Sequence, residues 1–302
     1  MRPSSRVIPE WVHLFVRQKS FRDEAMQHFR GAVGQQRVPA EFLESYSLPL
    51  PPLDEQRRIV ARVEELFARI EEARRLRAAA DQDAERLMPA ALEEVFEEAE
   101  SKGWPVKTVG DVIEGKPQYG TSQKASEEPV GAPILRMGNI VDGQVSFDDL
   151  KYIDLSPDEE AKYILHEGDV LFNRTNSAEL VGKSAVYPGG RRAVFASYLI
   201  RIVADQRKAM PHFIVAYINS PLGRQYIQSQ LTRAIGQVNV NAKKLQAMPI
   251  PVPPLLEQRR IVEYLDGVQA QVAELKQLQA GSAAELERLE QAILARAFRG
   301  EL

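Results

Sequence analysis

The sequence contains no cysteine and only four histidines among its 302 residues. A disulfide framework and a cysteine-ligated metal site are therefore excluded, and no two of the histidines stand at metal-ligand spacing. The longest uninterrupted apolar run, residues 213–218, is far too short to cross a bilayer. Residues 10–19, close to the start, are mixed and charged, unlike the apolar core of a signal peptide. These absences predict a cytoplasmic protein that binds no membrane.

No charge of one sign dominates the chain, which is 44% hydrophobic and 27% charged with a net charge of −3. That composition is ordinary for a soluble globular protein. The charge is unevenly distributed, because residues 54–100 carry 8 basic and 14 acidic groups whereas residues 101–253 carry 18 basic and 15 acidic groups. DNA binding depends on the local patch of charge rather than on the net charge of the protein. The net charge of this chain therefore does not exclude DNA binding by the mildly basic residues 101–253.

An internal repeat sets the organisation of the chain. The segment PLPPLDEQRRIV at 49–60 recurs as PVPPLLEQRRIV at 251–262, with ten of the twelve positions identical. The offset of 202 residues continues without a gap on both sides. Further identities at this offset are Gly34-Gln35 with Gly236-Gln237 and Phe96 with Phe298. Residues 1–100 therefore repeat residues 203–302, and residues 101–202 have no counterpart in the sequence.

A long helix is predicted at the end of each copy. Apolar residues fall at Ile59, Val63, Leu66 and Ile70, which is the spacing of a coiled-coil seam. The prolines before each helix stop the preceding structure and set the helix entry. A helix over residues 54–99 would be about 70 Å long at about 1.5 Å per residue. Both helices must bury their seams, and the simplest partner for each is the other.

The body between the helices is predicted to mix strands and helices. Stretches rich in β-branched and aromatic residues, bounded by Gly, Pro, Asn and Asp, predict strands at 132–140, 168–172, 183–187 and 193–203. Helices are predicted at 211–219 and 222–231, and at the repeat counterparts 9–17 and 22–29. We therefore expect an α+β fold, with a β-rich α/β domain and two long coiled-coil helices.

Signatures of catalysis are weak. An adenine methyltransferase needs an Asn/Asp-Pro-Pro-aromatic loop, and the nearest string, 219–222 (NSPL), lacks the second proline and the aromatic and favours a helix stop. No phosphate-binding Gly-x-x-x-x-Gly-Lys-Ser/Thr loop is present. The acidic string at 158–162 is too compressed for a nuclease and favours a solvated turn or a helix start. The sequence predicts a protein that is not an enzyme.

The junction Pro-Pro-Leu-x-Glu-Gln-x-x-Ile-Val occurs twice and opens a long helix each time. It resembles the conserved regions of type I restriction–modification specificity subunits. Four stretches of the body are similar to the target-recognition domains of the same family, and they lie at 134–140, 168–177, 180–183 and 236–240. The resemblance covers the whole chain, and the combination of these motifs is specific.

The resemblance implies a fold in which recognition domains alternate with helices that pack as an antiparallel stalk. Each recognition domain of that family reads one half of a bipartite double-stranded DNA target. Methyltransferase (M) subunits dock on the specificity subunit and methylate adenine with S-adenosylmethionine. Restriction (R) subunits add translocation and cleavage that depend on ATP and Mg. The specificity subunit is not a catalyst, so the resemblance implies no cofactor in this chain.

The repeat and the resemblance together predict four domains. These are the remnant of a first target-recognition domain at 1–50, the first long helix at 51–102, a complete recognition domain at 103–253 and the second long helix at 254–302. The first recognition domain is expected to be truncated at its N-terminal side. Two functions remain open, namely a DNA reader that directs methylation and restriction, and a non-reading assembly protein that binds methyltransferase subunits through the stalk. A homodimer that restores two readers is a further expectation.

The candidate DNA-binding residues are cations that anchor phosphates and side chains that form paired hydrogen bonds with bases. Most lie in three polar loops, at 116–124, 173–177 and 239–244, each of which could equally be a solvated turn. The glycine-rich string 188–192 is either a hairpin turn or a loop that carries two cations. Arg136 and Asn139 could instead be buried and hold the sheet. The full set is Lys116, Gln118, Tyr119, Thr121, Ser122, Gln123, Lys124, Arg136, Asn139, Arg174, Asn176, Ser177, Lys183, Arg191, Arg192, Asn239, Asn241, Lys243 and Lys244.

The repeated charged string at each helix start is the candidate partner-binding site. Acidic residues in a first turn complement the helix dipole, but the dipole does not explain the repeated arginines. By resemblance they lie where methyltransferase subunits dock, and plain solvation is the alternative. The residues are Glu55, Gln56, Arg57, Arg58, Glu257, Gln258, Arg259 and Arg260.

Overall fold

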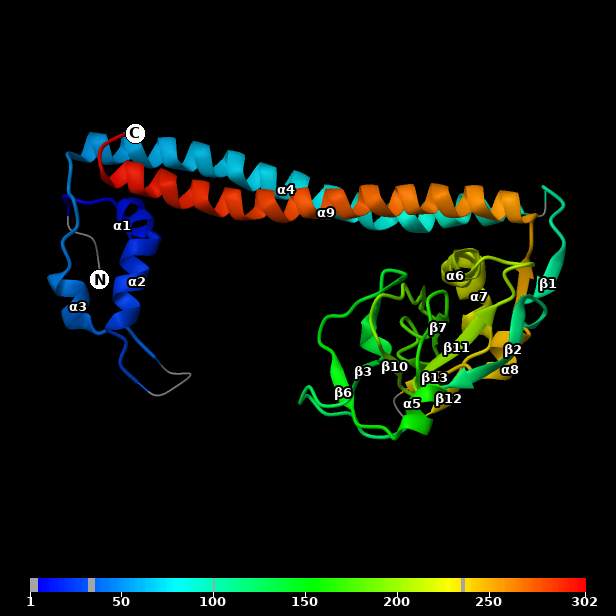
Figure 1. Cartoon of the computed structure of the whole chain (residues 1–302). Coiled ribbons are helices and arrows are strands. Elements are labelled where there is room, and N and C mark those ends of the chain that lie inside the picture. Colours follow the sequence, from blue (N-terminus) through cyan, green and yellow to red (C-terminus); the bar gives the residue numbers. More distant parts are fainter. Residues whose placement is uncertain (1–4, 32–35, 100, 235–236) are drawn as a thin grey trace. The chain divides into compact units, whose positions relative to one another are not determined.

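The computed structural model describes residues 5–31, 36–99, 101–234 and 237–302. It divides into a helical unit, Met1–Ala84 with Ala273–Leu302, and a mixed unit, Glu85–Val272. Both units are shown in Figure 1. Gly34, Gln35 and Gly236, which belong to the sequence repeat, lie outside the described residues.

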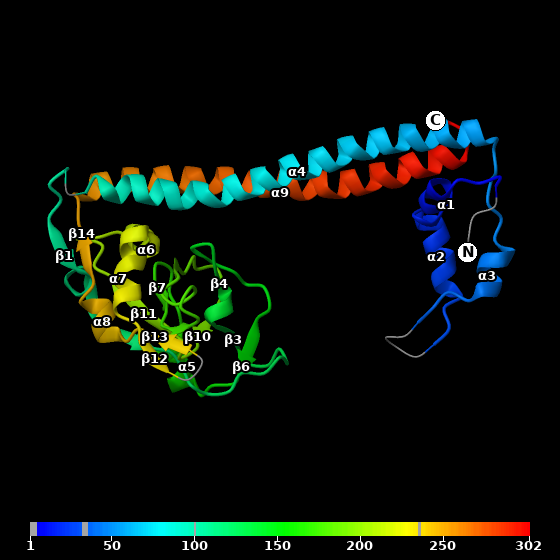
Figure 2. The same ribbon diagram turned by 180° about the vertical axis from the view of Figure 1, so that it is seen from behind.

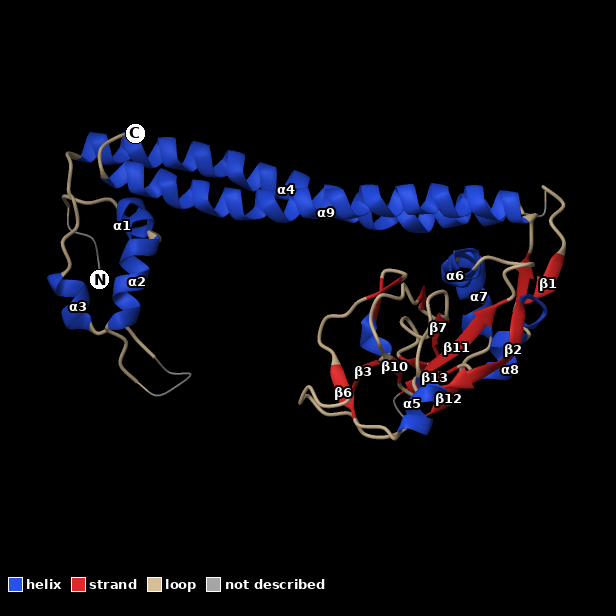
Figure 3. Ribbon diagram, viewed as in Figure 1, coloured by secondary structure: helices blue, strands red, loops and turns tan. Residues whose placement is uncertain are grey.

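The helices and the strands are each numbered in the order of the chain, and Figure 3 shows helices in blue and strands in red. The helices are α1 Pro9–Val16, α2 Lys19–Gln27, α3 Ala40–Ser45, α4 Leu53–Glu97, α5 Pro157–Tyr163, α6 Pro211–Asn219, α7 Pro221–Ser229, α8 Ala242–Gln246 and α9 Leu255–Phe298. The strands are β1 Val106–Thr108, β2 Ile113–Tyr119, β3 Ala132–Leu135, β4 Ile140–Val141, β5 Gln144–Val145, β6 Lys151–Ile153, β7 Val170–Asn173, β8 Thr175–Asn176, β9 Ser184–Val186, β10 Val194–Phe195, β11 Leu199–Ala204, β12 Thr232–Ala234, β13 Gln237–Asn239 and β14 Pro249–Pro251.

In the helical unit, α1, α2 and α3 gather beside the start of α4 and the end of α9 (Figure 2). Trp11 is 1% exposed, its ring centroid lies 4.4 Å from that of Phe298, and its indole N–H donates to the carbonyl of Pro49 at 2.8 Å. The predicted seam residues Ile59 and Val63 of α4 are buried in the same cluster. Apolar burial and one satisfied indole thus attach the short helices to the long ones.

The two long helices pack antiparallel. In the helical unit, Arg74 Nη2 of α4 contacts Glu290 Oε2 of α9 at 2.7 Å, and Arg77 Nη1 contacts the carbonyl of Gln279 at 3.4 Å. Rising residue numbers in α4 therefore face falling numbers in α9. The predicted α+β fold with two long antiparallel helices is confirmed.

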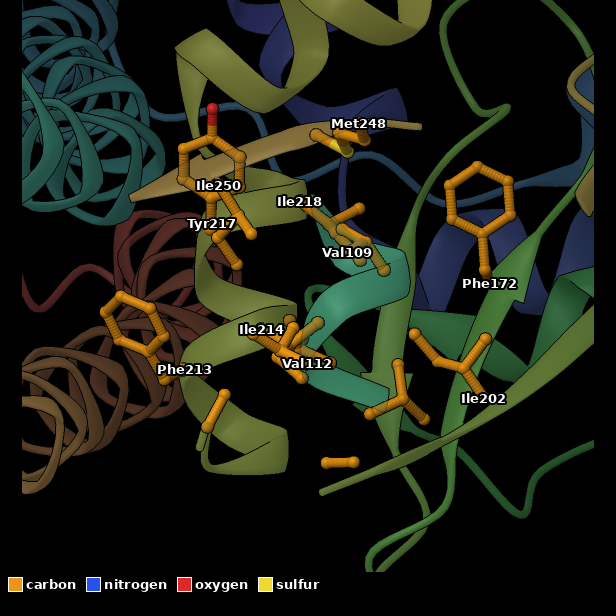
Figure 4. Packing of buried hydrophobic residues seen from close by; sticks show 14 of the residues in the cluster. Val109, Val112, Phe172, Ile202, Phe213, Ile214, Tyr217, Ile218, Met248 and Ile250 are labelled. Carbon is orange, nitrogen blue, oxygen red and sulfur yellow. The ribbon is translucent and has the colours of Figure 1, made fainter. Parts of the chain in front are cut away.

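The mixed unit is built from small sheets. The largest has the strand order β2-β11-β7-β9, and a second has the order β10-β3-β6 with β10 parallel to β3. β12, β13 and β8 form a third sheet, and β14 pairs with β1. The core lies between the largest sheet and α6, with Ile214 and Ile218 on the side of α6 toward Phe172 and Ile202 of the sheet (Figure 4). Phe213 lies on the other side of α6 and packs on Phe96 of α4, with ring centroids 5.6 Å apart.

The sequence repeat is also a structural repeat. Helices α1, α2, α3 and α4 begin at residues 9, 19, 40 and 53, and α6, α7, α8 and α9 begin at 211, 221, 242 and 255. Every pair of starts differs by the same offset as the sequence repeat. The isolated bridge between Arg30 and Arg37 is the counterpart of the pairing between Thr232 and Asn239. The helical unit therefore repeats the second half of the mixed unit.

A buried glutamine at the start of each long helix fixes the preceding chain in the same way. The amide nitrogen of Gln258 donates to the carbonyls of Lys208 and Pro253 at 2.9 Å, and its oxygen accepts from Met210 N at 2.8 Å. Both Gln258 and Gln56 are 0% exposed. Gln56 makes the three corresponding bonds, to Arg6, Pro51 and Ile8, at 3.0, 2.8 and 3.1 Å. We call this arrangement the glutamine clasp.

Two glycines of α9 are expected to weaken it. No heavy atom lies within 4 Å of the position that a Cβ would take at Gly267 or at Gly281. Because glycine in a helix interior costs about 0.5–1 kcal/mol relative to alanine, Gly267→Ala and Gly281→Ala should each raise the free energy of unfolding by that amount. Urea unfolding followed by circular dichroism measures the gain, and an unchanged or lower stability would contradict it.

Glu290 joins three helices of the helical unit. Its side chain is 13% exposed and accepts hydrogen bonds from Arg17, which directly follows α1, and from Arg74 of α4. Burial by itself raises the pKa of Glu290, but the hydrogen bonds from Arg74 and Arg17 outweigh it and hold the pKa below its ordinary value. A lowered folded-state pKa contributes stability above the unfolded-state pKa, and that contribution is lost as the pH falls.

Replacing Glu290 by glutamine should therefore destabilise the helical unit by ~1–2 kcal/mol at neutral pH, between the values for exposed and buried pairs. The difference from the wild type should shrink as the pH falls below about 4. Thermal melts across pH measure it. Asp23→Asn, which removes the exposed pair of Asp23 with Lys19 at 2.6 Å, is the matched control and should cost less than ~1 kcal/mol.

Candidate nucleic-acid interface

Three polar segments that are far apart in the sequence meet in the mixed unit. β13 pairs with β8, and the amide of Val240 donates to the carbonyl of Arg174 at 2.9 Å. The amide of Ala242 donates to the hydroxyl of Tyr119 at 2.9 Å. The three segments that the sequence predicted as separate loops for DNA contact therefore lie at one place, near the labels of β2 and β13 in Figure 1. The loop prediction is wrong for part of each segment, because residues 116–119 belong to β2, residue 173 to β7, residues 175–176 to β8, residue 239 to β13 and residues 242–244 to α8.

Arg174 is the residue at which these segments join. Its guanidinium carbon lies 4.9 Å from the centroid of the Tyr119 ring, in a cation–π contact. Its amide donates to the carbonyl of Tyr198 at 3.0 Å, and Nη1 lies 3.5 Å from the carbonyl oxygen of Ser197. We call the joined segments the polar edge, which consists of residues 119–124, 174–177, 197–198 and 239–244.

Gly120 permits the close approach of two of these segments. Thr121 forms a parallel bridge with Ala196, and its amide donates to the carbonyl of Phe195 at 3.0 Å. A Cβ at Gly120 would lie 2.2 Å from the carbonyl oxygen of Phe195 and 2.5 Å from that of Ala196. Because backbone atoms cannot move aside as a flexible side chain does, only glycine fits at this position.

A buried ion pair supports the start of the polar edge. Asp169 and Arg201 are 5% and 16% exposed, and their side chains are 3.3 Å apart. Arg201 also donates to the side-chain oxygen of Gln118, whose amide nitrogen donates to the carbonyl of Lys162 at 2.8 Å. Both ends of the Gln118 side chain are therefore engaged within the protein, and Gln118 holds β2 in place.

Helix α7 supports the loop between the polar edge and Lys183. Gln228 donates to the carbonyl of Ala178 at 2.6 Å, and Arg224 donates to the carbonyls of Glu179 and Val181. Burial lowers the pKa of Arg224 from its ordinary value. The carbonyl oxygens provide the acceptors that a buried guanidinium requires.

The predicted DNA-binding residues differ in their exposure. Those that are exposed are Lys116, Tyr119, Ser122, Gln123, Lys124, Ser177, Arg191, Arg192, Asn241 and Lys243. Those that are half-buried are Gln118, Arg136, Arg174, Asn176, Lys183, Asn239 and Lys244. Tyr198, which is 44% exposed and lies in the polar edge, was not predicted, because no motif marks it.

Two of the predicted DNA contacts are buried. Asn139 is 2% exposed, accepts from the amide of Arg136 at 2.9 Å, and donates to the carbonyls of Ser146 and Asp148. Asn139 therefore holds two turns together, which is the alternative that the sequence left open. Thr121 is 4% exposed, and its hydroxyl oxygen accepts from the amide of Gln123. For these two side chains, burial contradicts the prediction of base contact.

The glycine-rich string 188–192 is not a hairpin turn. It connects β9 to β10, which belong to different sheets. Both arginines fold back on the protein. Arg192 is paired with Glu160, and the guanidinium carbon of Arg191 lies 5.1 Å from the centroid of the Phe147 ring.

The candidate partner-binding residues divide into two kinds. Gln56 and Gln258 form the glutamine clasps, so their burial contradicts a direct role in docking. Most of the charged residues pair within one helical turn, as Arg58 does with Glu55 at 2.6 Å and Arg260 with Glu257 at 3.4 Å. Among the described residues, exposed Arg259 has no ion pair. Docking by these charged residues stays a prediction.

The strings weighed for catalysis have structural roles. The string 219–222 separates α6 from α7, where the hydroxyl of Ser220 accepts from Gly223 N. Asn219 binds both backbone groups of Ser184, at 3.0 and 2.9 Å. The acidic string 158–162 lies in α5, which starts with a capping box of Ser156 and Glu159. The parts of the chain that the structure describes hold no cluster of metal-ligating side chains and no helix long and apolar enough to span a membrane.

Known proteins share this organisation. The family described as the type I restriction modification DNA specificity domain matches residues 10–79 and 101–285. The EcoKI specificity subunit of Escherichia coli (strain K12) is 26% identical, over 100% of this chain and 67% of its own length. The StySPI specificity subunit of Salmonella potsdam has the same identity and coverage.

Two solved structures have the same fold. A chain from a structure of the type I R-M system has a TM-score of 0.74 and 32% identity, covering 97% of this chain and 72% of that chain. The crystal structure of the HsdS subunit from Thermoanaerobacter tengcongensis has a TM-score of 0.61 and 32% identity, covering 98% and 71%.

The fold, the repeat and these matches define a DNA-specificity protein that is not itself a catalyst. The chain belongs to the type I restriction–modification DNA specificity family. The resemblance that the two helix-opening motifs predicted is therefore confirmed.

Proposed function

We propose that the mixed unit reads one half-site of a bipartite double-stranded DNA target through the polar edge. The observation that carries this proposal is the convergence of three polar segments on Arg174. Exposed Lys124 and Lys243 supply phosphate anchors. The side-chain oxygens of Asn176 and Asn241 accept from the amides of Ser177 and Lys244 at 2.8 and 3.0 Å, and their Nδ2 groups supply donors for acceptors on base edges. A rigid scaffold that presents such groups together is what sequence readout requires.

The partners follow from the proposed reader. Methyltransferase subunits would dock on the chain and methylate adenine at the DNA site that the polar edge selects. A restriction subunit would depend on the same polar edge for its DNA specificity. S-adenosylmethionine, ATP and Mg would be bound by those partner subunits. Two copies of the chain would present two identical polar edges, and a homodimer would then read a palindromic target.

A map of methylated bases tests the proposal. The chain is expressed with a methyltransferase subunit of its own system in a host free of DNA methylation, and modified adenines are read across the genome. We expect a bipartite motif, which is palindromic if two copies of the reader act together. Stable co-purification of the two proteins without any methylated motif would contradict DNA reading.

The same experiment separates the reader from the assembly protein that the sequence left open. The described residues of the helical unit contain counterparts of α6 to α9 but no counterparts of β2, β7 and β8, so these residues by themselves form no second polar edge. Its role would be assembly. In a gel shift over a salt series, a reader prefers certain sequences at constant salt, whereas an assembly protein shows weak binding that salt abolishes uniformly.

A further inference from the structure

A cleft borders the polar edge where three parallel segments end. β10 is parallel to β3, with Phe195 opposite Leu135. Thr121, in the chain after β2, forms a parallel bridge with Ala196, in the chain after β10. The residues that follow these three parallel segments are therefore neighbours. Arg136 follows β3, and Tyr198 follows β10. Carboxyl ends of neighbouring parallel strands are a common place for ligands in α/β proteins.

Arg136 and Tyr198 line this cleft, which has a volume of about 420 Å³. Asp148 and Asp149 form part of its wall. Tyr198 is 44% exposed and also belongs to the polar edge through its hydrogen bond with Arg174. The cleft is therefore continuous with the surface that we propose for DNA.

The guanidinium of Arg136 is fixed on one side and open on the other. Nη2 donates to the carbonyl oxygen of Asp149 at 2.7 Å and to its Oδ2 at 3.2 Å. Asp149 has a φ of +48°, a conformation that L-residues rarely adopt, and this conformation accompanies both contacts. Within the described part of the chain, Nη1 has no acceptor and Nε is buried without one. The side chain is 28% exposed, so donors remain accessible.

The charge of the cleft favours a base over a phosphate. Asp148 and Asp149 outnumber the single cation of Arg136, so a phosphate would be repelled. A base edge carries no formal charge and offers acceptors to the guanidinium. The commonest specific contact between a side chain and DNA is arginine with O6 and N7 of guanine.

We propose that the Arg136 cleft receives the major-groove edge of one guanine of the target, with the two N–H groups of Nη1 donating to O6 and N7. Asp149 holds the guanidinium in the orientation for this contact. The inference rests on the proposed function of the polar edge and identifies one base that the edge selects.

The test uses the complex of the chain with its methyltransferase subunit and duplexes that carry the mapped motif. Each guanine in turn is replaced by 7-deazaguanine, which lacks the N7 acceptor. For the wild type, one such replacement should weaken binding about 10- to 100-fold. In Arg136→Lys the same replacement should change binding by less than about threefold, because lysine has no second nitrogen through which Asp149 can orient the donor. Arg207→Lys, which alters an exposed arginine outside the cleft and outside the polar edge, is the control and should keep the full loss of binding.

Each outcome decides the inference. If no guanine of the motif is sensitive in the wild type, or if Arg136→Lys keeps every penalty, the cleft does not read guanine. If the wild type prefers no sequence, the proposed function itself fails. Should Arg136→Lys not fold, Asp149→Asn replaces it. Asp149→Asn loosens the guanidinium and should reduce the loss of binding that 7-deazaguanine causes at the same position. An unchanged loss of binding would overturn the proposal.

Discussion

Gln258→Leu should destabilise the mixed unit by about 2–4 kcal/mol, because leucine leaves buried backbone groups of Met210, Lys208 and Pro253 without their hydrogen bonds. The volume of the side chain is nearly conserved, so the cost comes from the unsatisfied polar groups. Gln56→Leu should have a similar effect on the helical unit, since its clasp has the same three bonds.

The two tryptophans make this measurement specific to each unit. Trp11 lies in the helical unit and Trp104 in the mixed unit. Tryptophan fluorescence during urea unfolding, recorded in a Trp11→Phe background, reports on the mixed unit alone. The same background without the Gln258 change is the reference. A loss below about 1 kcal/mol would show that water replaces the glutamine and that the clasp does not hold the fold.

Arg174→Ala should reduce binding of the recognised sequence about 10- to 100-fold. The change removes a cation and also removes the contact that holds Tyr119, whose hydroxyl accepts from Ala242. The Tyr119 ring then loses its cation–π partner, whereas the backbone bonds of residue 174 with Tyr198 and Val240 remain. A freed ring and a missing guanidinium reduce discrimination as well as affinity. Binding to unrelated DNA should fall much less, because that binding depends on charge alone.

Arg207→Ala is the control for Arg174→Ala. Arg207 follows Ala204, the last residue of β11, whereas Tyr198 precedes Leu199, the first residue of the same strand. Because the amide of Arg174 donates to the carbonyl of Tyr198, Arg174 lies beyond the first residue of β11, whereas Arg207 lies beyond its last residue. Fluorescence anisotropy with matched and scrambled duplexes measures both variants in the methyltransferase complex. An equal loss for the two arginines, or an unchanged preference in Arg174→Ala, would contradict a special role of the polar edge.

Much of the fold could be predicted from the sequence, because its strongest signals are periodic. The seam of Ile59, Val63 and Ile70 predicted α4, and the repeat predicted α1 and α2 as the counterparts of α6 and α7. The short helices α3 and α8 were not predicted. β2 was missed because Gly115 and Pro117 lower its strand propensity. Proline is tolerated there because β2 is an edge strand of its sheet.

The candidate site was predicted less completely, because it depends on pairing between distant residues. Nothing in the sequence indicates that Val240 contacts Arg174 or that Ala242 contacts Tyr119. Polar residue types also do not show whether a side chain is exposed. Gln258 at a helix start and Asn139 in a turn both suggested binding, yet both satisfy buried backbone groups.

Amide hydrogen exchange of the methyltransferase complex, with and without its recognised duplex, tests most directly whether the polar edge binds DNA. We predict slower exchange at residues 119–124, 174–177, 197–198 and 239–244 when the duplex is bound, with little change in α5 and in α1 to α3. A scrambled duplex should give weaker protection of the same residues. Protection elsewhere, with unchanged exchange along the polar edge, would contradict DNA reading by these residues.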